Sequence, residues 1–161
     1  MNTAKEHIHK FINDFADGGA VNHLADLGMT VEQIVSKLDF PIPKAAVAEM
    51  VWKHFLDSGK ILMEKPKPGQ EFIEKITYEK VQGKYGRSSM QQIRTRIPIS
   101  AKEYAECDFG KHIKRDYEGF LSRISVLEAE DREYILGLPW PRVVVYHEMD
   151  ERMRRIMSRL A

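Results

Sequence analysis

Apolar residues in the first third of the chain recur three and four positions apart, a spacing typical of helices that bury one face. Thr30 is suited to cap the start of one such helix, and Gly59 is suited to end another because glycine adopts the left-handed conformation without strain. Pro41 and Pro43 break the chain between these two helices. The pattern predicts helices over residues 3–15, 21–27, 31–38 and 44–58.

The helix predicted over residues 44–58 can bury its apolar residues in two registers. One register buries Val47, Val51, His54 and Phe55, and the other, formed by Ala48, Trp52 and Phe55, fits almost as well. The first register leaves four side chains facing outward, namely Ala45, Glu49, Trp52 and Lys53.

The period of the apolar residues changes after Gly59. Residues 71–82 are rich in β-branched and aromatic side chains, and residues 90–99 place isoleucine or threonine at every second position from 93 onward. Arg94 and Arg96 fall between them, on the opposite face. Gly83 and Gly86 bracket a turn between the two runs. The segment therefore predicts a β-hairpin.

The final third of the chain returns to helical spacing. Phe109, Ile113, Phe120 and Ile124 fit one stripe, and a short helix is predicted over residues 128–136, before a rigid break at 137–141. Beyond the break, apolar side chains recur at alternating spacings of three and four, as in a short heptad seam. Such a seam packs either on its own domain or against a second chain, and we expect a homodimer. The predicted dimerisation residues are Tyr146, Met149, Met153, Ile156 and Leu160.

Two segments carry a family resemblance. Residues 24–38 (LADLGMTVEQIVSKL) resemble the opening of a helix-turn-helix unit, and residues 47–61 (VAEMVWKHFLDSGKI) resemble its recognition helix followed by a first wing strand. With the hairpin, the chain resembles the winged helix-turn-helix superfamily. The resemblance covers about half the chain and implies a winged module, which we place over residues 1–99; with the α-helical region that the spacing predicts over 100–161, we expect an α+β fold. It also implies a DNA-binding transcriptional regulator, with a recognition helix at about 44–58 and a basic wing at about 61–99.

The distribution of charge supports a local positive surface. The 161 residues hold 25 Lys and Arg against 24 Asp and Glu, but residues 60–96 hold nine against four and residues 1–59 hold five against eight. Wing cations can contact phosphates while an exposed helix reads base edges. The predicted DNA-binding residues are Lys44, Ala45, Glu49, Lys53, Lys65, Lys67, Lys84, Arg87, Arg94 and Arg96.

The outward face of the fourth helix leaves an alternative open. It has no arginine, asparagine or glutamine, the usual partners of guanine and adenine. An exposed Trp52 would suit a protein partner at least as well. The alternative is a winged-helix adaptor that binds another protein and not DNA.

Other features bear on the class of protein. The sequence has no apolar run of about 18 residues and no signal-peptide core, so we expect a soluble cytoplasmic protein. The single cysteine, Cys107, lies beside Asp108 and is expected to be structural. His147, Asp150 and Glu151 would share one helical face, where a weak divalent metal site is conceivable but a solvated charged surface is the favoured explanation. Without a Walker loop, nucleophile elbow or dinucleotide fingerprint, the sequence predicts no enzyme, catalytic residue, metal or cofactor.

Overall fold

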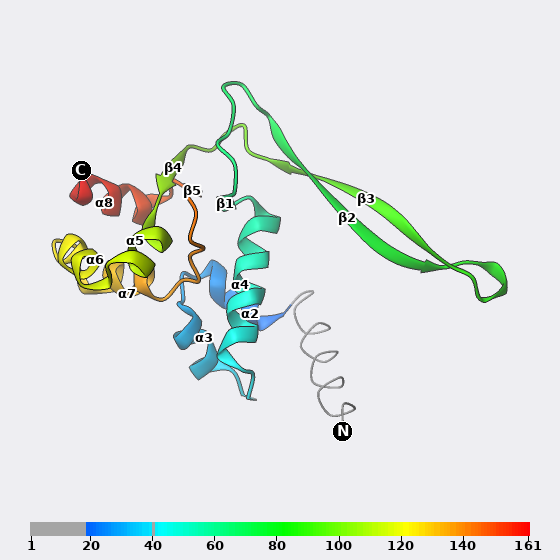
Figure 1. The fold of residues 1–161 in the computed structure, drawn as a ribbon, viewed down its shortest axis with the longest axis horizontal. Coiled ribbons are helices and arrows are strands. Elements are labelled where there is room, and N and C mark those ends of the chain that lie inside the picture. Colours follow the sequence, from blue (N-terminus) through cyan, green and yellow to red (C-terminus); the bar gives the residue numbers. More distant parts are fainter. Residues whose placement is uncertain (1–18, 40) are drawn as a thin grey trace.

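The computed structural model describes residues 19–39 and 41–161, which form a mixed α+β protein with a long two-stranded arm (Figure 1). The helix predicted over residues 3–15 lies outside the described residues. The described helices are α2 (Ala20–Asp26), α3 (Val31–Lys37), α4 (Lys44–Ser58), α5 (Phe109–Arg115), α6 (Tyr117–Ile124), α7 (Ala129–Leu136) and α8 (Glu151–Leu160). The strands are β1 (Ile61–Leu62), β2 (Phe72–Gln82), β3 (Ser88–Pro98), β4 (Tyr104–Cys107) and β5 (Val145–Glu148), with a short 3-10 turn, η1 (Lys84–Gly86).

Helices α2, α3 and α4 pack against one another, and their boundaries follow local sequence signals. The Thr30 hydroxyl accepts a hydrogen bond from the Gln33 backbone N–H at 3.3 Å, while the Gln33 side chain accepts one from the Thr30 N–H at 3.0 Å. This reciprocal capping box confirms the predicted start of α3. Helix α4 spans the predicted residues and ends at Gly59, whose φ of 75° is left-handed. A Cβ at Gly59 would also lie 2.6 Å from Ile97 Cγ2.

The buried face of α4 confirms Val47, Val51 and Phe55 of the first predicted register, whereas His54 is half-buried and pairs with Asp26. Val47, Val51 and Phe55 are fully buried, whereas Trp52 is only half-buried and packs against the edge of the core. Helix α4 therefore presents Ala45, Glu49 and Lys53 to solvent.

The predicted hairpin is confirmed as the arm, which we define as β2, η1 and β3. Its strands pair antiparallel over eleven residues each, from Phe72 opposite Pro98 to Gln82 opposite Ser88. They form a two-stranded sheet of their own that projects away from the helices (Figure 1). Isolated two-stranded hairpins are marginally stable in water. An arm of this length therefore presents backbone edges and side chains that the body of the chain does not cover.

Strand β1 does not join the arm, which corrects the expectation of a first wing strand. Ile61 pairs with His147 and Leu62 with Tyr146, so β1 lies beside β5, and β5 also pairs with β4. The segment 100–161, expected to be helical, thus supplies two of the three strands in this sheet. Segments far apart in the sequence share one sheet, because the short β1 finds its backbone partners in the C-terminal third.

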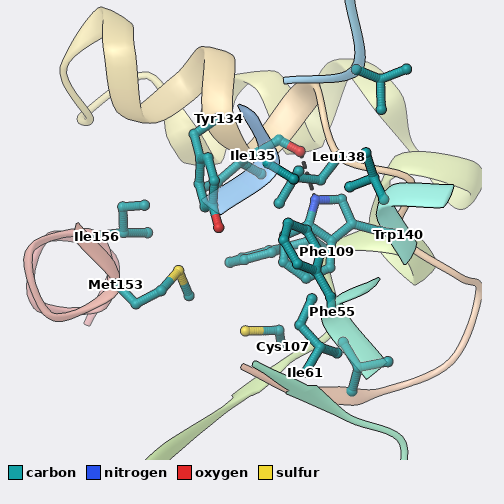
Figure 2. Packing of buried hydrophobic residues seen from close by; sticks show 14 of the residues in the cluster. Phe55, Ile61, Cys107, Phe109, Tyr134, Ile135, Leu138, Trp140, Met153 and Ile156 are labelled. Atoms are coloured by element: carbon teal, nitrogen blue, oxygen red, sulfur yellow. Dashed lines mark hydrogen bonds between the residues drawn. The ribbon is translucent and has the colours of Figure 1, made fainter. Parts of the chain in front are cut away.

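One hydrophobic core joins the two halves of the sequence (Figure 2). Phe109 lies at its centre, with ring centroids 5.2 Å from Trp140 in an edge-to-face arrangement and 5.8 Å from Phe120. The Trp140 indole N–H donates to the Ile135 carbonyl at 2.6 Å, which satisfies its buried polar atom. Phe55 and Ile61 enter the same cluster from α4 and β1.

The stripe expected to form one helix across residues 109–124 is divided between α5 and α6. Asp116 separates the two helices, and its side chain accepts a hydrogen bond from the Gly119 N–H at 3.0 Å, capping α6. Phe109 and Phe120 still meet in the core, but from two helices. An aspartate capping signal therefore overrides the continuous apolar spacing.

The prediction that the C-terminal seam lies on one helix is also wrong. Tyr146 lies on β5 and Met149 in the following loop, and α8 begins at Glu151, where the Asp150 side chain accepts from the Met153 N–H at 2.8 Å. Met153 and Ile156 are fully buried in the core of their own chain (Figure 2). Apolar residues spaced three and four apart can also pack a helix against its own domain, and α8 packs in this way. The five predicted dimerisation residues therefore do not form an exposed seam.

Candidate nucleic-acid interface

The two faces of the arm differ in composition. Residues directly opposite in an antiparallel pair project to the same face, so Glu74 shares a face with Arg96, and Ile76 with Arg94. We call this the arginine face, and its members are Phe72, Glu74, Ile76, Tyr78, Lys80, Gln82, Ser88, Met90, Gln92, Arg94, Arg96 and Pro98. At the base of the opposite face, Ile97 is buried and Lys75 pairs with Asp57 at the end of α4. At the base of the arm, the arginine face therefore points away from α4.

Most of the arm's cations are available to a ligand. Arg94 lies 3.6 Å from Glu74, and the Arg96 guanidinium lies 4.5 Å above the Phe72 ring. Lys80, Lys84 and Arg87 are exposed, and none of them forms an ion pair with any residue in the described ranges. One predicted contact, Arg94, is thus partly neutralised within the chain, whereas the cations near the tip are not.

Apolar side chains are exposed between these charges. Ile76, Tyr78 and Met90 lie on the arginine face, with Tyr78 64% and Met90 65% exposed. Tyr85 projects from η1 at the tip. Sequence reasoning missed them as candidate contacts, although alternation along β2 already placed Ile76 and Tyr78 on the other face from Ile73. The arginine face therefore combines positive charge with flat and apolar surface.

The predicted loop lysines lie at the base of the arm. Lys65 and Lys67 line a cavity of about 400 Å³ together with Glu74, Lys75 and Ile97. Both lysines are exposed, and the Lys67 backbone N–H donates to the Gln70 side chain at 2.9 Å, which fixes this loop. The structure thus brings these two residues together with the arm.

Helix α4 is less suited to be the main contact. Lys44 pairs with Glu32 at 3.0 Å and, like Ala45, lies at the end of α4 remote from the arm. The fifteen-residue helix is roughly 22 Å long at 1.5 Å per residue. The arm meets α4 at Asp57, so Lys53 is the predicted α4 cation nearest the arm. Lys44 and Ala45 therefore lie away from the arm, and of the predicted α4 residues Lys53 alone places a positive charge near it.

A second basic cluster was missed by the sequence analysis. Lys111, Lys114, Arg115 and Arg142 are exposed and line a shallow cavity of about 400 Å³ beside α5. The near-neutral charge of the C-terminal third concealed them. The signal that could have found the cluster is the spacing of three and four between its α5 members, which places them on one helical surface.

Both ring nitrogens of the buried His147 form hydrogen bonds within the fold. His147 is fully buried on β5, where its Nδ1 donates to the Glu148 carbonyl at 2.7 Å and its Nε2 accepts from the Tyr134 hydroxyl at 2.9 Å. Burial lowers the pKa of His147, so the ring is neutral. Because His147 lies on a strand, it does not share a helical face with Asp150 and Glu151 as expected. Its two nitrogens are used in the core and are not open to a ligand.

Cys107 is equally inaccessible. Its side chain is almost fully buried, and its Sγ lies 3.6 Å from the Ala105 carbonyl. Burial is the main cause that raises the pKa of the thiol to about 12, with smaller contributions from Asp108 and Glu106. Desolvation therefore outweighs the charges of these two carboxylates in raising the pKa. A thiol in this environment is a poor nucleophile.

Within residues 19–39 and 41–161, no three His, Cys, Asp or Glu side chains are grouped so that they could hold a metal ion. None of the helices in these ranges combines the length and apolar character needed to cross a membrane. Comparisons with protein-family models, curated proteins and solved structures find no match to this chain. It is therefore the geometry and charge of the arm that indicate a function.

Proposed function

We propose that this chain is a DNA-binding protein, a transcriptional regulator whose arm makes the main contact with duplex DNA. The observation that carries the proposal is the division of charge between arm and body. The arm holds six Lys and Arg against two Asp and Glu, a net charge of +4, whereas the rest of the chain holds 19 against 22, a net charge of −3. A polyanion is attracted to the arm and repelled by the rest of the chain as a whole.

The shape of the arm supports the same proposal. The major groove of DNA admits a two-stranded β-ribbon, and the arm is such a ribbon with both strands eleven residues long. Exposed cations along its arginine face and tip would contact phosphates and release counterions. In this proposal, Lys65 and Lys67 extend the contact at the base of the arm, and Lys53 is the α4 residue closest to the nucleic acid.

The decisive experiment measures affinity for a duplex at several salt concentrations. Each phosphate contact contributes about 0.9 to the slope of log K against log salt. Lys84 and Arg87 have no ion-pair partner among the described residues, so Lys84→Gln with Arg87→Gln removes charge without disturbing the fold. We expect this double variant to lower the slope by about 1.8. Arg94→Ala with Arg96→Ala should also weaken binding.

A matched control changes the charge in the other direction. Glu79 is exposed on the arm, and Glu79→Gln keeps the shape of its side chain while raising the arm's charge by one. We expect tighter binding at low salt and convergence with the unsubstituted protein at high salt. Absence of duplex binding at low salt, or affinity that ignores all of these charge changes, would contradict the proposal.

The second candidate is an adaptor that binds another protein. The exposed Ile76, Tyr78 and Met90 favour it, because contiguous apolar surface is typical of protein interfaces. Trp52, proposed for this role from the sequence, is half-buried against the core. An adaptor should lose its partner in a pull-down with Trp52→Ala or Tyr78→Ala and should be indifferent to DNA.

A homodimer also belongs to the DNA-binding proposal, since paired subunits can bind paired half-sites. Its contact would use surfaces other than the buried Met153 and Ile156. Solution mass measured over a range of concentrations tests it. A chain that stays monomeric at high concentration would remove the dimer from the proposal.

A further inference from the structure

The aromatic ring at the tip of the arm is almost completely exposed. Tyr85 is 98% exposed, and its side chain forms no hydrogen bond or ring contact with any residue that the structure describes. The turn is closed instead by backbone, with the Gly83 N–H donating to the Arg87 carbonyl at 2.7 Å. Packing and hydrogen bonding within the described chain therefore do not explain a tyrosine at this position.

The backbone at Tyr85 makes the residue more unusual. Its φ of 69° and ψ of 29° lie in the left-handed region, and Tyr85 is the sole non-glycine residue with positive φ in the described ranges. This conformation is unfavourable for a side chain with a Cβ, and glycine or asparagine would adopt it more readily. The tip thus keeps a large aromatic side chain that both its backbone and its exposure disfavour. Such an outlier motivates a functional hypothesis.

The surroundings of Tyr85 indicate the chemistry of its partner. Lys84 precedes it, and Arg87 follows after Gly86. The nearest acidic residue in the sequence is Glu79, six positions away on β2. Strands of eleven residues place the tip roughly 33 Å beyond the base of the arm at 3.3 Å per residue. A flat ring held between cations at this distance from the body suits a base flanked by phosphates.

The geometry points to Tyr85 as a stacking residue that inserts beside a base where the duplex is already opened or easily unstacked. This inference deepens the proposed function and rests on it. Inserting a side chain between intact base pairs requires unstacking them, and a bulged or mismatched site has already lost part of that stacking. Lys84 and Arg87 would hold the adjacent phosphates while the ring stacks. The arm would therefore favour a distorted duplex over a regular one.

The test compares three DNA probes of the same length: an intact duplex, a duplex with a one-nucleotide bulge, and a duplex with one mismatch. The unsubstituted protein should bind the bulged probe about tenfold more tightly than the intact one, within the range that base stacking provides. Tyr85→Phe should keep this ratio because the ring remains. Tyr85→Asn should reduce it towards one while suiting the left-handed backbone, so that loss of the turn does not explain the result.

A charge variant and an optical signal separate stacking from phosphate contact. Lys84→Gln should weaken binding to all three probes by the same factor and leave the ratio unchanged. 2-Aminopurine placed at the bulge should change its fluorescence with the unsubstituted protein and with Tyr85→Phe but not with Tyr85→Asn.

The outcomes distinguish the inference from the function on which it rests. Equal binding of all probes by the unsubstituted protein, or an unchanged ratio in Tyr85→Asn, overturns the stacking role while the arm's DNA binding stands. Failure of the unsubstituted protein to bind any probe at low salt overturns both. A fall in solution mass on Tyr85→Asn, without any change in probe selectivity, would assign the tip to contact with a second copy and also overturn the inference.

Discussion

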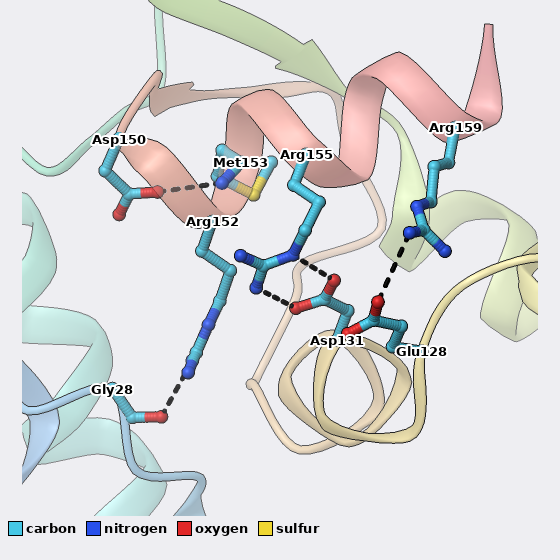
Figure 3. A network of polar contacts seen from close by, with 8 residues as sticks. All are labelled: Gly28, Glu128, Asp131, Asp150, Arg152, Met153, Arg155 and Arg159. Atoms are coloured by element: carbon cyan, nitrogen blue, oxygen red, sulfur yellow. Dashed lines mark hydrogen bonds and ion pairs between the residues drawn. The ribbon is translucent and has the colours of Figure 1, made fainter.

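The Arg155 guanidinium of α8 holds the Asp131 carboxylate of α7 through two hydrogen bonds, of 2.8 Å from Nε and 2.7 Å from Nη2 (Figure 3). Asp131 is fully buried, and this pairing is the main cause that lowers its pKa. One turn further along α8, Arg159 pairs with Glu128 at 3.2 Å. Near the start of the helix, Arg152 donates a hydrogen bond to the Gly28 carbonyl at 3.1 Å. Helix α8 is thereby attached to α7 and to the end of α2.

The Asp131–Arg155 pair should make stability depend on acid pH. A carboxyl with a lowered folded pKa stabilises the fold above its unfolded value of about 3.9, and this contribution is lost as the pH falls through the folded pKa. We expect Asp131→Asn to lower the free energy of unfolding at pH 7. Urea unfolding of both proteins between pH 7 and pH 3 should show the difference narrowing below about pH 4. A difference independent of pH would show that the charge of Asp131 contributes nothing.

The buried face of α8 provides a second prediction. Met153 is fully buried, so Met153→Ala should lower the free energy of unfolding by about 2–5 kcal/mol through lost contacts and the cavity left behind. Ser158→Ala on the exposed side of the same helix should change it by no more than about 0.5 kcal/mol. Denaturant unfolding measures both. If Met153→Ala altered solution mass and left stability unchanged, α8 would be packing between chains.

Local signals made much of this fold predictable. Thr30 caps α3 as its residue type predicts, and Gly59 ends α4 where its conformational freedom suggested. The prediction for residues 146–160 was wrong for a physical reason. Tyr146 and Met153 fit one helical stripe in the sequence, but Tyr146 lies on a strand and Met153 on a helix. The spacing of apolar residues over these fifteen positions does not show that a strand ends and a helix begins among them. It also does not show whether the surface that covers these residues belongs to the same chain.

Pairing at long sequence range was beyond the same reasoning. Ile61 finds His147 across the sheet, 86 positions away, and no local pattern identifies that partner. In the candidate site, alternation placed Arg94 and Arg96 on one face correctly. The exposure of Tyr85 and the grouping of Arg142 with the α5 cations needed three-dimensional structure, because both depend on what the rest of the chain leaves uncovered.

Buried His147 predicts a second pH dependence. Burial lowers its folded pKa, so the unfolded chain takes up a proton near pH 6.5 that the folded chain does not bind. Stability is therefore fully present above about pH 6.5 and declines as the pH falls below it. Unfolding between pH 7.5 and pH 5 should show a steeper decline for the unsubstituted protein than for His147→Gln. Equal steepness in the two proteins would contradict this prediction.

The environment of Cys107 predicts slow thiol chemistry. Because burial raises its pKa to about 12, little thiolate forms at neutral pH, and the sulfur is also shielded from reagents. We expect an aromatic disulfide reagent to label the native protein many-fold more slowly than the urea-unfolded protein at pH 7.5. Raising the pH to 9 should accelerate labelling of the unfolded chain far more than that of the folded one. Rapid labelling of the native protein would place Cys107 at an accessible site.

The distal arm should be dispensable for folding and necessary for DNA binding. Ile76 and Arg94 lie directly opposite, so residues 77–93 can be replaced by an Asn-Gly turn that closes the shortened hairpin. None of the deleted residues belongs to the hydrophobic core, and we expect the free energy of unfolding to change little. The salt slope of DNA binding should fall by about 2.7, because Lys80, Lys84 and Arg87 are lost.

A full-length control separates the arm's charge from its surface. Substituting Gln for Lys80, Lys84 and Arg87 keeps Tyr85 and the ribbon in place, and it should reproduce the loss of salt slope. Preference for a bulged over an intact duplex should survive in this variant and disappear in the shortened arm. If the shortened protein bound DNA with an unaltered salt slope, the phosphate contacts would lie outside the distal arm. The same measurement would then be made on variants of the basic cluster beside α5, which consists of Lys111, Lys114, Arg115 and Arg142.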